Sequence, residues 1–236
     1  GIDVKHFVRS DITKEDTEKL RTTLGIQPDE LMILSLSRIS YEKNIHVIVQ
    51  QFPEVLMSYP NARLVIVGKG PYREDLEAMA RELEIEDYVQ FTGEVPHEEV
   101  AYYYHAADYF VSASTSETQG LTYAEAIASG TQCVVEGNDY LTQLLNDESL
   151  GITFERNEDF SESFVRYVQQ QIPIDPIVQK NKLVEISAER FGDEILKFYQ
   201  EMLIYYAENH TETSTPARTV QKMRIRINSL RNGEDK

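Results

Sequence analysis

Two glutamates, separated by seven residues, stand where the sequence predicts a strand, a short polar loop and a helix. Glu117 lies in the loop, and Glu125 lies about one turn inside the helix. The apolar run 108–111 predicts a buried strand before them, and the segment 121–129 predicts a helix that ends at a glycine. Carboxylates accept hydrogen bonds from vicinal hydroxyls, so the pair suits a ligand that carries hydroxyl groups.

The start of the predicted helix favours an anion. The helix begins near Gly120, with Leu121 and Thr122 in its first turn. Its unpaired N–H groups and the positive end of its dipole favour a phosphate, and Gly120 has no Cβ that would block one. A central phosphate with hydroxyls on both sides is the layout of a nucleotide sugar. In the alternative interpretation, both glutamates are solvated residues that the helix dipole favours.

The glutamate pair also carries a family resemblance. Glu117 and Glu125, followed by Ala126 and closed by 128–130, resemble the E-x7-E signature of retaining GT-B glycosyltransferases, and those of family 4 (group 1) most closely. The resemblance implies that Glu117 faces the donor sugar as a catalytic residue and that Glu125 holds the ribose hydroxyls. It also implies an α/β fold, a Rossmann-like parallel sheet with helices on both faces, which is the C-terminal half of a GT-B protein.

A second motif brings positive charge. The apolar segment 31–37 predicts a buried strand, and the segment 38–44 that follows it resembles the family motif G-R-L-x-x-E-K-N, with Ser37 in place of the glycine. The carboxyl end of a strand is where α/β sheets bind ligands. The resemblance implies that Arg38 and Lys43 neutralise the donor pyrophosphate and stabilise the departing diphosphate. The alternative is a surface Arg and Lys paired with Glu42.

Two further turns are candidates for nucleotide contacts. The predicted strand 63–67 ends in the G-x-G-P turn 68–71, so Gly70 either touches the nucleotide or belongs to a plain tight turn. After the predicted strand 88–92, the resemblance assigns Gly93, Glu94 and Val95 to the nucleobase. The three consecutive tyrosines 102–104 are expected to divide between core and surface rather than to stack on a base.

The remaining patterns define the domain organisation. We expect residues 1–208 to form the nucleotide-sugar-binding domain and 209–236 to form a polar linker and a basic amphipathic tail. Pro53 is expected to bend or interrupt the helix predicted for 45–58. Further strands are predicted at 131–136 and 151–154, and further helices at 14–24, 72–84, 97–106, 140–146, 160–171, 177–189 and from 191 onward.

Composition and charge exclude several classes of protein. The 236 residues are 41% hydrophobic and include no apolar run of membrane-spanning length. The formal charge is −17, and because 209–236 carry +3, residues 1–208 carry −20, which argues against a nucleic-acid-binding protein. The basic tail is expected to lie on an anionic membrane or to dock on an acceptor domain; a frayed, solvated tail is the remaining alternative.

The sequence shows no motif for metal binding or for nucleophilic catalysis. The five histidines lack metal-ligand spacing, and there is no D-x-D pair, so we expect no metal and no cofactor beyond the donor substrate. Cys133 lies in a predicted core strand and is expected to pack there in a reducing compartment. The segment 1–7 resembles the family's inter-domain crossing, which implies that an N-terminal acceptor domain is missing and that the chain alone is inactive.

The closest resemblance is to the bacterial diacylglycerol glucosyltransferases, on the segments 37–44, 119–122 and 137–141. It implies retaining transfer of a hexose from UDP-glucose to a diacylglycerol, by a cytoplasmic protein at the inner face of the membrane. The chain lacks the proline that most of the family carries after the glycine at 130. Two alternatives stay open: a non-catalytic nucleotide-binding or interaction module, and a sugar-nucleotide epimerase of the same architecture.

Overall fold

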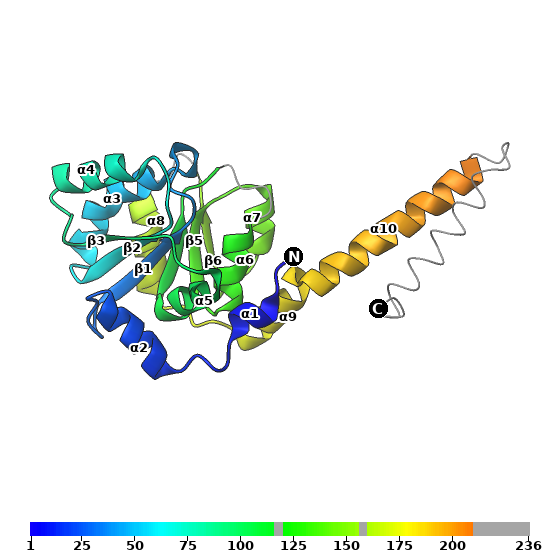
Figure 1. Ribbon diagram of the computed structural model, residues 1–236, viewed down its shortest axis with the longest axis horizontal. Helices are drawn as coiled ribbons and strands as arrows, with labels where there is room; N and C mark the ends of the chain where they lie inside the picture. Colours follow the sequence, from blue (N-terminus) through cyan, green and yellow to red (C-terminus); the bar gives the residue numbers. More distant parts are fainter. Residues whose placement is uncertain (116–119, 156–159, 210–236) are drawn as a thin grey trace. The chain divides into compact units, whose positions relative to one another are not determined.

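The computed structural model describes residues 1–115, 120–155 and 160–209. The chain divides into two compact units (Figure 1). The larger unit, Ile2–Val184, is an α/β domain. The other consists of Gly1 and Glu185–Lys236, and its described part contains α10, Ala188–Asn209. The predicted linker and tail therefore lie, except for Asn209, outside the described residues.

The larger unit contains a six-stranded sheet in which every neighbouring pair is parallel. Its order is β3-β2-β1-β4-β5-β6, the order of a doubly wound nucleotide-binding sheet. The prediction of a Rossmann-like parallel sheet is confirmed. The strands are β1 Leu31–Leu36, β2 Ala62–Val67, β3 Val89–Gly93, β4 Tyr109–Ser112, β5 Gln132–Glu136 and β6 Gly151–Phe154.

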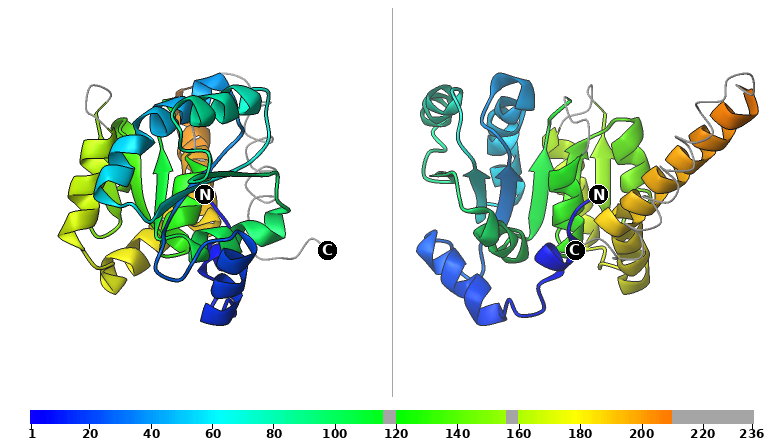
Figure 2. Two further views of the ribbon diagram at one scale, coloured as in Figure 1. Left: turned by 90° about the vertical axis from the view of Figure 1, so that its left-hand side faces the viewer. Right: turned by 45° about the vertical axis from the view of Figure 1, so that its right-hand side comes forward.

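Helices cover both faces of this sheet, α3, α4 and α8 on one face and α5 and α6 on the other (Figures 1 and 2). Strands β1, β2 and β5 are buried along most of their length, which is why they read as nearly continuous apolar runs rather than as alternating ones. The helices are α1 Val4–Val8, α2 Lys14–Thr23, α3 Ile45–Ser58, α4 Arg73–Glu82, α5 His97–Ala106, α6 Leu121–Ala128, α7 Asp139–Leu144, α8 Phe160–Gln170 and α9 Pro176–Ile186.

The strand order reverses between β1 and β4, which are neighbours in the sheet. From β1 the chain moves outward to β2, and from β4 it moves outward to β5, so the loops after β1 and β4 diverge. A crevice forms at such a point, beyond the carboxyl ends of the strands. The fold thus brings the segments after Leu36 and Ser112 to one edge of the sheet.

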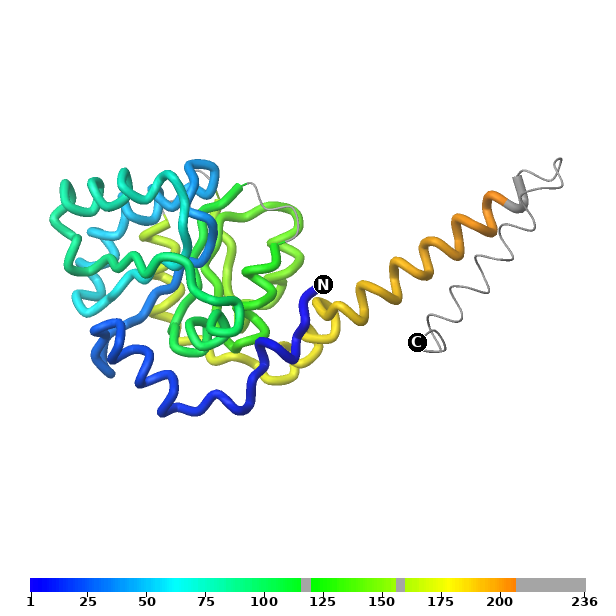
Figure 3. The backbone as a smooth tube through the Cα atoms, viewed as in Figure 1, coloured from blue at the N-terminus to red at the C-terminus, as the bar shows by residue number. Residues whose placement is uncertain are grey.

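The N-terminal segment crosses the domain before it enters the sheet, through α1 and α2 into β1 (Figure 3). Helix α1 packs against α5 and α6, and its Phe7 is buried. The carbonyl oxygen of Phe7 lies 2.8 Å from Nε2 of His105, on α5. Periodicity did not predict α1, because five residues are too few to show a helical pattern.

Two local predictions need correction. Pro53 was expected to bend or interrupt helix α3; the helix runs from Ile45 to Ser58 with the proline inside it, so the interruption was wrong. Five buried side chains, Ile45, Ile48, Val49, Phe52 and Val55, fix this helix against the core, and tertiary packing outweighs the backbone hydrogen bond that a proline removes. In addition, Tyr41–Lys43 forms a short 3-10 helix before α3, which the sequence did not predict.

Candidate functional site

A crevice of about 720 Å³ lies at the carboxyl ends of β1, β2 and β3, beside the beginning of α6. It is where the reversal in strand order predicts a ligand site. Five residues assigned to the site from sequence line it together: Arg38, Gly70, Glu94, Val95 and Thr122. Its other lining residues are Leu36, Ser37, Val67, Gly68, Lys69, Pro71 and Val100.

The loops after β1 and β2 form the floor of this crevice by close backbone contact. The N–H of Ser37 donates to the carbonyl of Val67 (3.1 Å), and the N–H of Ile39 donates to the carbonyl of Lys69 (3.0 Å). A Cβ on Gly70 would lie 1.9 Å from the carbonyl oxygen of Ile39. The plain-turn interpretation of this glycine therefore has a structural reason, although the residue also lines the crevice.

The two predicted phosphate-binding cations lie on the loop after β1. Arg38 is exposed and lines the crevice. Lys43 is half-buried at the end of the 3-10 helix and is not among the lining residues. Asn44 then adopts a left-handed conformation (φ 52°), and its side-chain amide donates to the carbonyl of Ala113, after β4, at 3.0 Å. This hydrogen bond ties together the two loops that diverge at the reversal.

Helix α6 begins at Leu121, as predicted, with Gly120 at its N-cap. Gly120 has φ +57°, a conformation that favours glycine, and a Cβ there would lie 2.6 Å from a ring carbon of Tyr140. This conformation and this contact explain the glycine without a ligand, so the proposed clearance for a phosphate stays a prediction. Thr122 lines the crevice, and Leu121 is 40% exposed.

Glu125 lies one turn further into α6 than Thr122 and is half-buried. Its Oε2 accepts a hydrogen bond of 3.0 Å from the hydroxyl of Tyr104, on α5. Burial raises the pKa of the Glu125 carboxyl, and the Tyr104 hydrogen bond and the nearby His97 and His6 oppose that rise. Glu125 is therefore not a solvated helix-start glutamate, and that alternative was wrong for this residue.

Of the other predicted site residues, one lies outside the described part of the chain and two lie at the end of β3. Glu117 lies outside the described residues, so its role stays a prediction. Gly93 ends β3 with φ +81°, and its carbonyl accepts the N–H of Gly68 (2.9 Å). Glu94, which follows, forms an ion pair with Lys69 at the rim, and both side chains are exposed.

Sequence reasoning missed several residues of the crevice. Lys69 stands inside the G-x-G-P turn, so the turn itself was a signal for it. Val100 carried no signal, because a valine on a helix reads as core. The tyrosines divide as expected, with Tyr103 and Tyr104 buried and Tyr102 partly exposed. The contact between Tyr104 and the carboxylate on α6 could not be foreseen.

Within residues 1–115, 120–155 and 160–209, no three His, Cys, Asp or Glu side chains gather so that they could hold a metal ion. Over the same part of the chain, no helix combines the length and apolar character needed to cross a bilayer.

A doubly wound parallel sheet with a crevice at its strand-order reversal defines the Rossmann-like class of nucleotide-binding domains. Residues 16–182 match the family model described as glycosyl transferases group 1, and the chain belongs to this family.

Two curated relatives support this assignment. The chain is 44% identical over 204 residues to an alpha-monoglucosyldiacylglycerol synthase of Streptococcus pneumoniae, which covers 86% of the chain and 46% of the relative. It is 36% identical over 195 residues to the protein of the same name from Acholeplasma laidlawii, which covers 83% of the chain and 48% of the relative. The chain thus spans about half the length of these relatives.

Solved structures show the same fold. A glycosyltransferase of Rickettsia africae aligns with a TM-score of 0.73 at 17% identity, over 86% of this chain and 56% of that one. The Anabaena protein HepE, in complex with UDP and glucose, aligns with a TM-score of 0.71 at 18% identity, over 85% and 55%. Such neighbours confirm the GT-B class of fold.

Proposed function

We propose that this chain is the donor-binding domain of a glucosyltransferase, which binds UDP-glucose for transfer of the hexose to a diacylglycerol lipid. The observation that carries the proposal is the crevice at the strand-order reversal, where Arg38, Gly70, Glu94, Val95 and Thr122 meet. The names of the two curated relatives support glucose as the hexose and a diacylglycerol as the acceptor. The UDP of the Anabaena complex supports uracil as the base.

Each side chain would act on one part of the donor. Arg38 and Lys43, with the N-terminus of α6, would hold the diphosphate and stabilise its charge as the bond to sugar C1 breaks. Glu125 would accept the ribose hydroxyls, and Glu117 would orient the hexose. The loop 93–95 would meet the base through its backbone. Transfer would retain the configuration at C1, as in the E-x7-E enzymes that the sequence resembles.

Transfer would also proceed without a metal ion, because the cations and the helix terminus can neutralise the diphosphate. A transfer assay with excess chelator tests this part. Undiminished turnover is expected, whereas a loss that added Mg²⁺ or Mn²⁺ restores would contradict metal-independent transfer.

The acceptor would lie outside this chain. Because the chain spans about half the length of its relatives, we propose that an N-terminal acceptor domain completes the active site. The basic tail 209–236 would hold the enzyme at the inner, cytoplasmic face of an anionic membrane or dock on that domain. Deleting 217–236 and measuring sedimentation with anionic vesicles separates the two, since unchanged vesicle binding contradicts membrane contact.

Calorimetry on the 236-residue chain tests the donor site directly. UDP and UDP-glucose are expected to bind, and GDP and ADP more weakly. A chain that binds none of these nucleotides would contradict the proposal. Conversion of UDP-glucose to UDP-galactose would favour an epimerase. Binding without transfer, even when the chain is fused to the N-terminal half of the pneumococcal relative, would favour a non-catalytic module.

A further inference from the structure

Tyr104 presents a buried hydroxyl to the second glutamate of the motif. The tyrosine has no exposed surface, and its hydroxyl donates to Oε2 of Glu125 at 3.0 Å. The two residues lie on different helices, α5 and α6, both on the same face of the sheet. The buried hydroxyl is thus bonded to a half-buried carboxylate on α6, the helix whose Thr122 lines the crevice.

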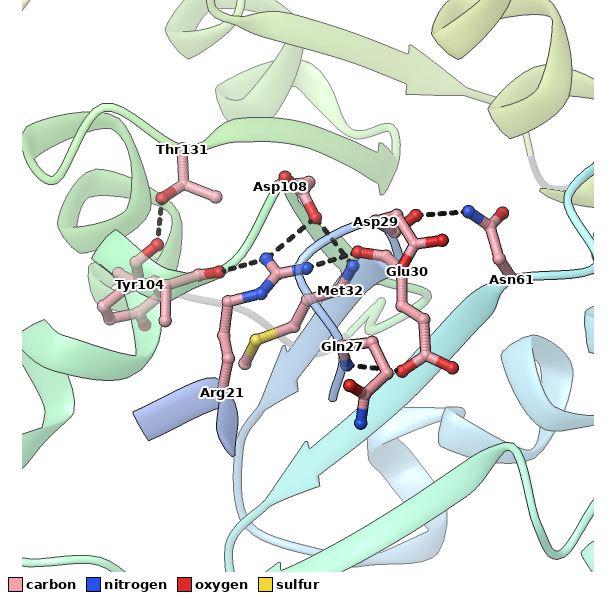
Figure 4. Close-up of polar contacts among 10 residues, drawn as sticks. Arg21, Gln27, Asp29, Glu30, Met32, Asn61, Tyr104, Asp108 and Thr131 are labelled. Atoms are coloured by element: carbon pink, nitrogen blue, oxygen red, sulfur yellow. Dashed lines mark hydrogen bonds and ion pairs between the residues drawn. The ribbon is translucent and has the colours of Figure 1, made fainter. Parts of the chain in front are cut away.

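The tyrosine is itself held firmly. Its ring contacts Phe7 and Phe110, with centroid distances of 6.1 and 5.7 Å. Its backbone carbonyl accepts a hydrogen bond of 2.7 Å from the hydroxyl of Thr131, which precedes β5 (Figure 4). Because the ring and the backbone are both fixed, the position of the hydroxyl is fixed too.

Tyr104 and Glu125 each share a helix face with a residue that lines the crevice. Val100 and Tyr104 are four residues apart on α5, and Thr122 and Glu125 are three apart on α6, so each pair shares one face of its helix. Val100 and Thr122 line the crevice. Side chains on a helix lean toward its N-terminus, so Glu125 leans toward the turn that begins α6.

Among the described residues, the hydrogen bond to Glu125 reaches one of its two carboxylate oxygens. Tyr104 donates to Oε2, and across the described residues no donor reaches Oε1. A carboxylate held by one oxygen keeps acceptor capacity on the other. We propose that Tyr104 is a positioning residue of the donor site: it fixes Glu125 so that the second oxygen meets the ribose hydroxyls of the nucleotide. This inference rests on the proposed function.

Calorimetry with two ligands tests the inference. UDP and 2′,3′-dideoxy-UDP differ only in the ribose hydroxyls, so the ratio of their affinities reports the contact with Glu125. We expect wild type to prefer UDP by about tenfold. Tyr104→Phe is expected to reduce this preference several-fold while leaving the affinity for dideoxy-UDP unchanged. In a protein that already carries Glu125→Gln, adding Tyr104→Phe is expected to cause no further change in the preference for UDP over dideoxy-UDP.

Tyr167→Phe is the matched control. This buried tyrosine on α8 donates to the carbonyl of Glu148 (2.5 Å), away from the crevice, and its loss is expected to lower the melting temperature without changing the preference. If Tyr104→Phe weakens both ligands equally, or weakens neither, the positioning role is wrong while UDP binding stands. If wild type binds no UDP, the proposed function fails first, and the inference fails with it.

Discussion

Gly68 and Ser37 approach so closely that the space for a side chain at residue 68 is filled by the backbone of the neighbouring loop. A Cβ on Gly68 would lie 1.9 Å from the carbonyl oxygen of Ser37. Both residues line the crevice, so the contact sets the separation between the loops after β1 and β2. The shape of the candidate site therefore depends on glycines that need not touch a ligand.

Gly70→Ala isolates this steric effect. Gly70 has no positive φ, whereas Gly68 (φ +140°) would add backbone strain. Since the new Cβ would clash with the backbone carbonyl of Ile39, which cannot rotate away as a flexible side chain can, we expect Gly70→Ala to destabilise the chain by about 2–3 kcal/mol and to weaken UDP binding. Thermal unfolding and calorimetry measure the two effects.

Gly192→Ala, in α10, is the control for that substitution. Apart from its chain neighbours and the backbone of its own helix, no atom of the described residues lies within 4 Å of its Cβ position, so the change is expected to raise stability by about 0.5–1 kcal/mol, the difference in helix propensity. A Gly70→Ala protein that is as stable as Gly192→Ala would show that the two loops can separate at little cost.

At the amino ends of the strands, opposite the crevice, an arginine side chain links several segments. Arg21, on α2, donates to Oδ2 of Asp108 (3.2 Å) and to the carbonyl of Ala106 (2.9 Å), and it also donates to the carbonyl of Glu30 (Figure 4). The same Asp108 oxygen accepts the N–H of Met32 at 2.7 Å. One partly buried guanidinium thus joins the segments that enter β1 and β4.

Arg21→Ala would remove these hydrogen bonds, which takes one donor from each of two carbonyls and leaves the Asp108 carboxylate with the N–H of Met32 but without its cation. We expect a loss of roughly 2–3 kcal/mol in unfolding free energy, which for a chain of this size lowers the melting temperature by about 4–12 °C. Arg81→Ala, an exposed arginine on α4, is the control and is expected to change stability by less than about 0.5 kcal/mol. UDP affinity should not change in either variant, and a stable Arg21→Ala protein would contradict the structural role.

Much of this architecture could be read from the sequence. Most positions of β1, β2, β4 and β5 are apolar, and turns with Gly or Pro follow several of the strands, so the existence and type of these strands were predictable. Helix α5 begins and ends at the predicted residues, His97 and Ala106, and β6 does so at Gly151 and Phe154. The site residues were predicted by spacing and resemblance, and the reversal in strand order explains why five of them meet.

The rest depended on contacts between distant segments. The hydrogen bond from Tyr104 to Glu125 joins residues 21 apart on two helices, and no periodicity encodes which tyrosine of three faces α6. The clash that requires Gly70 arises from a loop 31 residues earlier in the chain, so the sequence showed only a turn. Short elements such as α1 fell below the length at which a helical pattern can be recognised.

Glu125 makes stability depend on pH. Because burial raises the pKa of its carboxyl, the folded chain binds a proton there more tightly than the unfolded chain does. Its contribution to stability is therefore fully present below the ordinary pKa of 4.5 and is lost as the pH rises through the raised value. We expect Glu125→Gln to raise the melting temperature at pH 8 and to lose this advantage as the pH falls toward 4.5.

The same variant is expected to bind UDP more weakly, which would make Glu125 a group that serves the ligand at the expense of stability. Glu82→Gln, on an exposed position of α4, controls for the loss of one negative charge and should alter neither the melting temperature nor its pH dependence. A Glu125→Gln protein whose melting curve follows wild type at every pH would show that burying the carboxylate costs nothing.

Arg38 gives the sharpest test of the diphosphate contact. It lines the crevice from the loop after β1, and a charge-assisted hydrogen bond to phosphate contributes about 1.5–3 kcal/mol. We expect Arg38→Ala to weaken UDP binding by roughly 10–100-fold. Uridine, which has no phosphate, should bind wild type and variant alike. Calorimetry measures UDP, and an NMR titration measures uridine.

Net charge cannot produce this pattern. Arg81→Ala removes the same charge from an exposed position on α4, so its UDP affinity should equal that of wild type. Residues 1–208 carry −20, so an anion binds only where cations are concentrated, and added salt should weaken UDP binding to wild type more than to Arg38→Ala. If the two arginine variants lose UDP affinity equally, the field of the whole chain, and not a contact from Arg38, governs the diphosphate.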